Sequence, residues 1–315
     1  MAAFSADHIP VMRTEVVEYL SPALAKPSVY VDGTLGLAGH ARAILEANPE
    51  ARLIGIDRDP QALDIAAERL LPYKERVSLH HAVFSELPDV LARENVEHVE
   101  AMLLDLGLSS LQIDNAERGF AYMAKAPLDM RMDQSTGRSA ADIVNTASET
   151  ALAQLLRELG DEKFAGRIAR SIVAVRNQAP IETTNELVDV IVHAIPRGAE
   201  TGGHPAKRTF QALRIAVNSE LDALRLVLPA ALDALAVGGR LAVLAYHSGE
   251  DRMVKQAFQE AVSDHAPKDL PVVPDELKAT HKLLTRGAQK PTEAEVKGNP
   301  RAASARLRVV ERTRS

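Results

Sequence analysis

A glycine-rich turn is the first segment of this sequence whose residue types could hold a ligand. It reads Asp32-Gly-Thr-Leu-Gly36-Leu-Ala-Gly39-His40, and it follows a short apolar run and precedes a helical pattern. Glycine lets the backbone turn sharply and approach a ligand closely. A second apolar run ends at Asp57, and an acid at that position typically binds the hydroxyls of a ribose. Together these features predict a nucleotide-type ligand at the turn.

The charge and spacing of the turn indicate a ligand without phosphates. A dinucleotide site has the pattern G-x-G-x-x-G, whereas the glycines here are Gly33, Gly36 and Gly39. A carboxylate at Asp32 would also repel a pyrophosphate. S-adenosylmethionine fits better, because it carries an adenosine and a cationic tail that Asp32 could receive. An NAD-dependent oxidoreductase stays the alternative, as do the plainer roles of a strand-to-helix loop and, for Asp57, of a helix N-cap.

A second group of polar residues follows the fourth apolar run, in the segment Asp105-Leu-Gly-Leu-Ser109-Ser110. Ligands of open α/β sheets bind at the carboxyl ends of the strands. A carboxylate and a backbone carbonyl there can accept the N–H groups of a target amine and turn its lone pair toward a methyl group. We therefore expect Asp105 to be the catalytic acceptor, with Ser109, Ser110, Asn218 and His247 as weaker candidates. A simple loop cap is the alternative for Asp105.

The segment His247-Ser248-Gly249-Glu250-Asp251 suggests a hydrolase or a metal site, and the sequence argues against both. It has no G-x-S-x-G elbow, and a histidine and a serine that are adjacent in the chain do not readily form a base–nucleophile pair. A metal would need more ligands than His40 and His247. We expect no metal.

The elements that must position these residues alternate along the chain. Short apolar runs end near residues 32, 57, 82 and 106, with helical patterns between them, which is typical of a buried parallel sheet. The period then becomes helical, with Thr183-x-x-Glu186 as a capping box, before strand character returns at 240–246 and 306–312. We expect an α/β domain formed by residues 1–114 and 207–315, and an inserted helical domain, 115–206, for substrate recognition.

Composition excludes several classes of protein. The 315 residues are 46 % hydrophobic and 25 % charged and include no cysteine, which is typical of a folded chain without disulfides, thiolate metal sites or a cysteine nucleophile. Residues 1–10 have no features of a signal peptide, and no apolar run is long enough to span a membrane. We expect a cytoplasmic protein with no membrane partner.

The net charge of −6 argues against general nucleic-acid binding, but the charge is uneven. Residues 278–315 contain ten basic and three acidic residues, a net +7, which leaves −13 on the rest of the chain. A local basic region can bind a phosphate backbone. The alternative is a solvated tail.

Longer motifs carry a resemblance that covers about residues 8–312. The segments HIPVM, DGTLGLAGH, GIDRDPQAL, LLDLGLSSLQID, PLDMRMD, HPAKRTFQALRIAVNSEL, VGGRLAVLAYHSGEDR and NPRAASARLR resemble those of the MraW family, the bacterial small-subunit rRNA cytosine-N4 methyltransferases. The resemblance implies a class I S-adenosylmethionine-dependent methyltransferase: a Rossmann-like, mostly parallel sheet with an inserted all-helical domain. It implies methylation of the exocyclic N4 of a cytidine in the decoding centre of 16S rRNA, within the small ribosomal subunit.

The resemblance also assigns the cofactor contacts, and one of these positions departs from the family. The resemblance places the contacts at Ala38, Gly39, His40, Asp57, Phe84, Asp105 and Gln112. The glycine-rich turn adds Asp32 and Gly36 as candidates. The family loop usually has glycine where this chain has Ala38, and we expect that methyl group to be tolerated only if φ is negative there. Two further departures are Gly249, where leucine is common, and Ala303, where arginine is usual.

Some alternatives stay open on the sequence alone. Besides the oxidoreductase, they are an RNA-binding assembly factor without activity, and the same chemistry on DNA or a free amine. We expect rRNA and not DNA as the partner, with a homodimer open.

Overall fold

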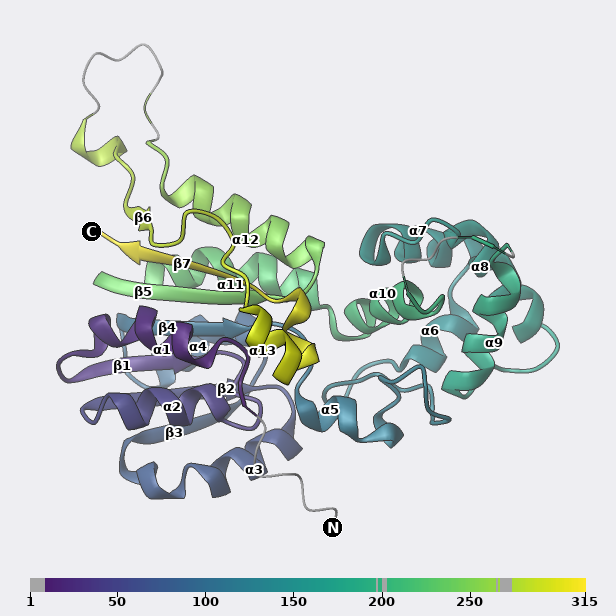
Figure 1. Cartoon of the computed structure of the whole chain (residues 1–315), viewed down its shortest axis with the longest axis horizontal. Coiled ribbons are helices and arrows are strands. Elements are labelled where there is room, and N and C mark those ends of the chain that lie inside the picture. The colour runs from purple at the N-terminus through teal and green to yellow at the C-terminus, as the bar shows by residue number, and fades with distance from the viewer. Residues whose placement is uncertain (1–8, 197, 200–202, 265, 267–273) are drawn as a thin grey trace. The chain divides into compact units, whose positions relative to one another are not determined.

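The chain forms two compact units in the computed structural model (Figure 1), which describes residues 9–196, 198–199, 203–264, 266 and 274–315. One unit comprises described residues of 1–107 and 221–315, and the other comprises described residues of 108–220. Residues 1–8, where we expect no signal peptide, lie outside the described residues. Among the described helices, none is long and apolar enough to cross a membrane.

The first unit is built on a seven-stranded sheet in the order β3-β2-β1-β4-β5-β7-β6. Strands β1 to β5 are parallel, and β7 is antiparallel to both β5 and β6. The bounds are β1 Ser28–Asp32, β2 Ala51–Asp57, β3 Val77–His81, β4 Val99–Asp105, β5 Leu235–Ala245, β6 His281–Leu283 and β7 Arg306–Arg312. The strand order reverses between β1 and β4, which is where open sheets of this kind bind ligands. The expected class I methyltransferase fold is confirmed.

Both faces of the central strands β1, β2 and β4 are largely buried, which explains why these strands read as continuous apolar runs. Tyr30 and Leu103 belong to the core on one face, while Val31 and Met102 belong to the core on the other. The first core is covered by α1 Arg13–Leu20, α2 Gly39–Ala47 and α3 Pro60–Arg69. The second is covered by α4 Leu87–Arg93, α11 Glu220–Ala234 and α12 Ser248–Ala261. Because both faces of the central strands are packed, their polar side chains Asp32, Asp57 and Asp105 lie at the strand ends.

The second unit is helical and has its own core. Its helices are α5 Ser110–Asp114, α6 Ala140–Thr146, α7 Glu149–Gly160, α8 Ala165–Arg176, α9 Thr184–Ala194 and α10 Lys207–Asn218. Leu152, Leu156, Ile168, Ile172 and Leu187 are fully buried in this core. The expected capping box at Thr183 and Glu186 is present at the start of α9.

The unit boundaries differ from those expected from the sequence, which placed the helical domain at 115–206. The helical unit runs from Leu108 to Glu220, because α5 and α10 belong to it. Helix α10 packs so closely on α7 that a Cβ on Gly160 would lie 2.6 Å from the carbonyl oxygen of Arg208. The hydrophobic spacing of α10 shows an amphipathic helix but not which core it covers.

The close contact at Gly160 yields a stability prediction. We expect Gly160→Ala to lower the free energy of unfolding by about 1–3 kcal/mol, since the added methyl overpacks α7 against α10. The matched control is Gly166→Ala in α8, where a Cβ would meet nothing within 4 Å and alanine should stabilise the helix slightly. Urea denaturation of both variants checks the sign; equal effects would contradict the packing argument.

Candidate functional site

The side chain of Asp57 fixes the glycine-rich turn to the end of β2. Its Oδ2 accepts the N–H of Gly36 at 2.6 Å and its Oδ1 accepts the N–H of Asp59 at 2.8 Å. Burial raises the pKa of Asp57 to about 6, and these two N–H groups oppose that rise. The alternative role of Asp57 as an N-cap is wrong, because Asp59 caps α3 by accepting the N–H of Gln61.

Ala38 adopts a left-handed conformation, with φ 61°, so the expectation of a negative φ at this residue is wrong. The residue is buried and is the N-cap of α2: its N–H binds the carbonyl of Leu35 and its carbonyl accepts the N–H of Arg42. The turn into α2 thus requires a positive φ whatever residue is present. A residue with a Cβ pays about 1–2 kcal/mol for this conformation.

Asp32 lies beneath the turn and is 1 % exposed. The hydroxyl of Tyr30 donates to its Oδ2 and the N–H of Thr34 donates to its Oδ1, both at 3.2 Å. Burial raises the pKa of Asp32 to about 7, although the charge of His40 opposes the rise. Asp32 is therefore a buried acid held by two donors from β1 and the turn.

Asp105 is where β4, α2 and the end of β5 converge. Its Oδ1 accepts the hydroxyl of Tyr246 at 2.7 Å, and its Oδ2 lies 3.5 Å from Nε2 of His40. The side chain of Asp105 keeps 26 % of its surface exposed, while its backbone N–H binds the hydroxyl of Thr34 at 2.6 Å. The fold thus brings the predicted residues Asp105 and His40 together and leaves the carboxylate accessible.

His40 has a buried nitrogen that no described residue satisfies. The residue is 6 % exposed, and its Nδ1 has no hydrogen-bond partner among the described residues. A buried polar atom of this kind normally has a partner in the complete complex. His40 therefore indicates a polar ligand beside the turn.

Phe84 and Gly33 adjoin each other on the opposite side of the turn. Phe84 begins a short 3₁₀ helix after β3, and its Cβ would lie 3.6 Å from a Cβ on Gly33. Gly33 itself is closely covered, since that Cβ would come within 2.6 Å of the Leu104 side chain. The ring of Phe84 is half-buried and provides an apolar surface next to the turn.

His247 caps a helix. Its Nδ1 accepts the N–H groups of Gly249 and Glu250, at 3.2 and 3.4 Å, at the start of α12. Its Nε2 lies 3.1 Å from Oε1 of Glu250. The ring thus has a structural role in the first unit. Among the described residues, no group of three or more His, Asp or Glu side chains could hold a metal ion.

The remaining predicted site residues belong to the helical unit. Ser109 and Gln112 form a capping box at the start of α5, in which each side chain binds the backbone N–H of the other. Ser110 is buried. Asn218 holds the loop before α6, because its Oδ1 accepts the N–H of Met132 and its Nδ2 donates to the carbonyl of Met130. These bonds give Ser109, Gln112 and Asn218 a structural role within their own unit.

Two residues at this site, Tyr246 and Glu250, were not predicted as site residues from the sequence. Tyr246 holds Asp105, and a Cβ on Gly107, whose φ is 110°, would lie 3.2 Å from the tyrosine ring. Glu250 is buried, and its Oε2 accepts the N–H of Tyr246 at 2.8 Å. A tyrosine directly after an apolar strand at the ligand-binding edge was the available signal.

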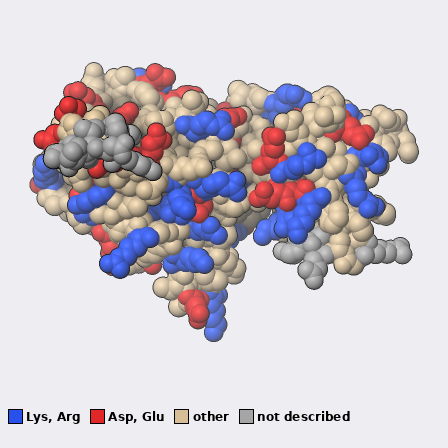
Figure 2. Space-filling model, turned by 90° about the horizontal axis from the view of Figure 1, so that it is seen from above, with Lys and Arg blue, Asp and Glu red and all other residues tan. Residues whose placement is uncertain are grey.

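The basic C-terminal region is folded and largely neutralised, so the interpretation as a solvated tail is wrong. Arg306 and Arg308 both pair with Asp251, and Lys282 pairs with Glu311. Figure 2 shows lysines and arginines standing among acidic and uncharged residues on the face it presents. Three exposed cations of this region, Arg286, Lys290 and Lys297, have no ion-pair partner among the described residues.

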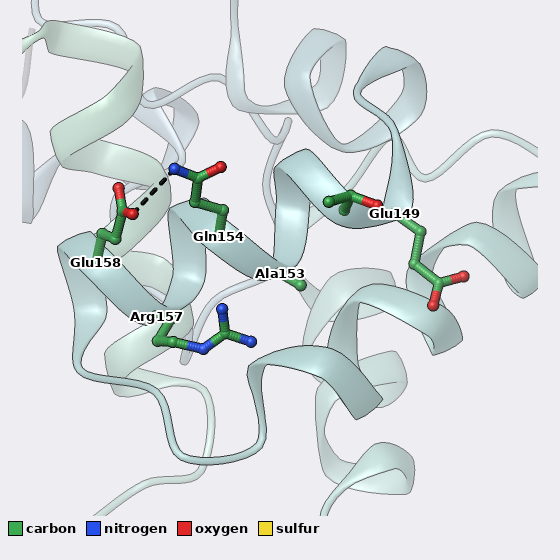
Figure 3. Close-up of a pocket in the computed structure, with 6 residues that line it drawn as sticks. Glu149, Ala153, Gln154, Arg157 and Glu158 are labelled. Atoms are coloured by element: carbon green, nitrogen blue, oxygen red, sulfur yellow. Dashed lines mark hydrogen bonds between the residues drawn. The ribbon is translucent and has the colours of Figure 1, made fainter.

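A hollow on the surface of α7 is not the predicted site (Figure 3). All six residues that line it come from that helix, and one of its hydrogen bonds joins Gln154 to Glu158. It contains none of the residues predicted from the sequence. We therefore place the candidate site at the carboxyl ends of β1, β2 and β4.

Comparison with known proteins shows which families and structures this chain is similar to. A family model described as the MraW methylase family matches residues 5–313. The chain is similar to proteins named ribosomal RNA small subunit methyltransferase H from Cutibacterium acnes (56 % identity, 98 % of this chain and 93 % of that protein) and Renibacterium salmoninarum (54 %, 98 % and 95 %). An rRNA methylase structure from Streptococcus thermophilus aligns with TM-score 0.44 and 13 % identity, covering 97 % of this chain and 99 % of that one.

Glycine usually destabilises a folded protein when it replaces alanine, but the left-handed conformation of Ala38 predicts the opposite. We expect Ala38→Gly to raise the free energy of unfolding by about 1 kcal/mol, because glycine adopts a positive φ without a Cβ penalty. Ala43→Gly, inside α2, is the control and should lower it by about 1 kcal/mol. Thermal denaturation of both variants is the measurement, and a destabilised Ala38→Gly protein would contradict the argument.

The raised pKa of Asp32 predicts a pH-dependent effect of its removal. The folded chain holds the Asp32 proton from about pH 4 to about pH 7, where the unfolded chain has lost it, so this group's contribution to stability falls as pH rises through that window. Asp32→Asn, neutral at every pH, should gain at least about 1 kcal/mol over wild type between about pH 5 and about pH 8. Urea titrations measure this gain. Asp64→Asn, at an exposed position, should show a flat difference, and a flat difference for Asp32→Asn would refute the prediction.

Proposed function

The chain belongs to the MraW methylase family, and from this we propose that it transfers a methyl group from S-adenosylmethionine to the exocyclic N4 of a cytidine in the decoding centre of 16S rRNA. The observation that carries the proposal is the accessible carboxylate of Asp105, held beside the buried His40 at the ligand-binding edge of a methyltransferase sheet. The relatives' names support ribosomal RNA as the substrate class.

The residues around the turn fit the donor molecule. The Nδ1 of His40, which no described residue satisfies, requires a polar partner. Each oxygen of Asp57 accepts an N–H from a described residue and keeps a lone pair that a ribose hydroxyl could use. We assign donor binding to Ala38, Gly39, His40, Asp57, Phe84 and Asp105, with Asp32 and Gly36 supporting them. Gln112, which the resemblance also assigns to the donor, ranks lower because it already makes the structural bonds of the capping box of α5. When bound, the donor supplies an electrophilic methyl group on a sulfonium.

Asp105 is the first candidate for activating the target amine. The N4 lone pair of cytosine is delocalised into the ring, so the nitrogen is a poor nucleophile until an acceptor binds its N–H and turns it. Tyr246 fixes the Asp105 carboxylate by one oxygen, and positioning of this kind can lower a barrier by several kcal/mol. Once methylated, the nitrogen is strongly acidic, so no strong base is needed. Ser109, Asn218 and His247 rank lower, since each already makes a structural bond, and Ser110 remains a secondary candidate.

The RNA must present its base outside a stack or pair to reach Asp105. We assign recognition of the surrounding rRNA to the helical unit, and phosphate contacts to Arg286, Lys290 and Lys297. Because the chain as a whole carries −6, we expect recognition of a shaped site rather than general RNA affinity. The proposal includes a cytoplasmic location, and a homodimer stays an expectation.

Substitution of Asp105 tests the function. We expect Asp105→Asn to lower methyl transfer to small subunits, at saturating donor, by at least about 100-fold. The negative charge is lost, and while Tyr246 uses one oxygen, the other acceptor becomes an NH2 donor that cannot accept the N4–H. Mass spectrometry of rRNA from cells lacking the gene, complemented with wild type or variant, gives the matching result: N4-methylcytidine absent without the gene and not restored by the variant.

Asp64→Asn is the control for that experiment and should restore methylation. Near wild-type turnover by Asp105→Asn would remove Asp105 from its role. Unchanged N4-methylation in cells lacking the gene would overturn the substrate.

A further inference from the structure

A short segment before α1 lies directly on the turn. The ring of Pro10 covers Gly39, because a Cβ on Gly39 would lie 2.5 Å from Pro10 Cγ. Pro10 is half-buried, while Val11 and Met12 are buried in the core beneath α1. The segment Ile9–Met12 therefore closes over one of the residues to which we assign the donor.

This segment is fastened by the C-terminal part of the chain. Oε1 of Glu295, in α13 Glu293–Gly298, accepts the N–H of Met12 at 2.6 Å. The side-chain amide of Asn299 donates to the carbonyl of Ile9 at 3.4 Å, and the hydroxyl of Tyr19 in α1 donates to Gln289 at 2.9 Å. Figure 1 draws α13 at the end of the sheet where β5 ends. The bonds to Ile9 and Met12 link positions almost 300 residues apart.

These hydrogen bonds hold the backbone of Met12 in a conformation that it would not keep without them. Met12 is the N-cap of α1, has φ 51° and is fully buried, and α1 has no side-chain cap of its own. A positive φ at a residue with a Cβ persists only where the surroundings enforce it. The hydrogen bond that the Met12 N–H donates to Oε1 of Glu295 fixes this backbone from outside α1.

Glu295 also stands near the catalytic side of the site. Burial, and then the neighbouring charge of Asp105, raise the pKa of Tyr246, and the charges of Glu250 and Glu295 add to the rise. One carboxylate in α13 thus lies within electrostatic reach of the tyrosine that holds Asp105 and also binds the segment on Gly39.

We propose that Ile9–Met12 forms a wall of the donor site and that Glu295 is the positioning residue that holds this wall on Gly39. The inference rests on the proposed function. The wall would shield the turn from water and keep Gly39 and His40 in place for the donor. It makes the C-terminal segment part of the donor site although that segment contains none of the residues assigned to donor contact.

The test compares Glu295→Ala, Glu295→Gln and Glu293→Ala in the full chain. Glu293 is the matched control, an exposed glutamate in the same helix. Calorimetry with S-adenosylhomocysteine gives the dissociation constant, and hydrogen exchange reports on the amides of residues 11–16. We expect Glu295→Ala to raise the dissociation constant about tenfold and to speed exchange in this segment. Glu295→Gln, which keeps an acceptor oxygen, and Glu293→Ala should stay within about threefold of wild type.

The outcomes separate the inference from the function on which it rests. Faster exchange with unchanged affinity in Glu295→Ala would overturn the wall, and unchanged exchange would overturn the role of Glu295; in both cases the donor site stands. Failure of the wild-type chain to bind S-adenosylhomocysteine would overturn the proposed function itself.

A second variant covers the case in which Glu295→Ala does not fold. Pro10→Ala leaves the Glu295 bond intact and removes only the ring that lies on Gly39, and we expect it to weaken binding of S-adenosylhomocysteine several-fold. Wild-type affinity in Pro10→Ala would overturn the wall.

Discussion

The bond between the Asp57 carboxylate and the N–H of Gly36 is the interaction on which the rest of the site depends. At 2.6 Å it ties the turn after β1 to the end of β2, and so it fixes where α2 begins. From that point the chain delivers Ala38, Gly39 and His40 in succession. The side chains of Leu35 and Ala38 pack into the core, and the Asp57 carboxylate supplies the acceptor that the backbone N–H of Gly36 needs.

The same edge of the sheet keeps Asp32, Asp57 and Asp105 close together, and the charges of His40 and Arg58 oppose only part of the rise in the pKa of Asp32 and Asp57. The structure does this with neutral donors: backbone N–H groups for Asp57, a tyrosine hydroxyl and an N–H for Asp32, and a second tyrosine hydroxyl for Asp105. These donors offset only part of the effect of burial, so burial still raises the pKa of Asp32 and Asp57. This edge of the sheet therefore favours a cationic ligand, because a positive charge placed there would stabilise the ionised acids.

The basic residues of the C-terminal region mainly stabilise the fold. Most of the cations that make that region basic in the sequence are used on acids or carbonyl groups of the same unit, as Arg308 is on Asp251 and Arg312 on the carbonyl of Leu235. Neutralised charges contribute little to steering a polyanion. This leaves the few exposed cations, and the shape of the helical unit, as the basis that we propose for recognising RNA.

The sequence by itself determined the sheet, the helical insertion and the acids at the strand ends, because apolar runs and helical periods are local patterns that burial enforces. It also supplied the family. It could not determine the φ of Ala38, the side of the boundary on which α10 lies, or the use of Asn218 and His247 as structural supports. Nor could it show that Tyr246 holds Asp105, or that Glu295 binds Met12 from the far end of the chain. Each of these depends on contacts between residues distant in the sequence, and only the packed tertiary structure brings those residues together.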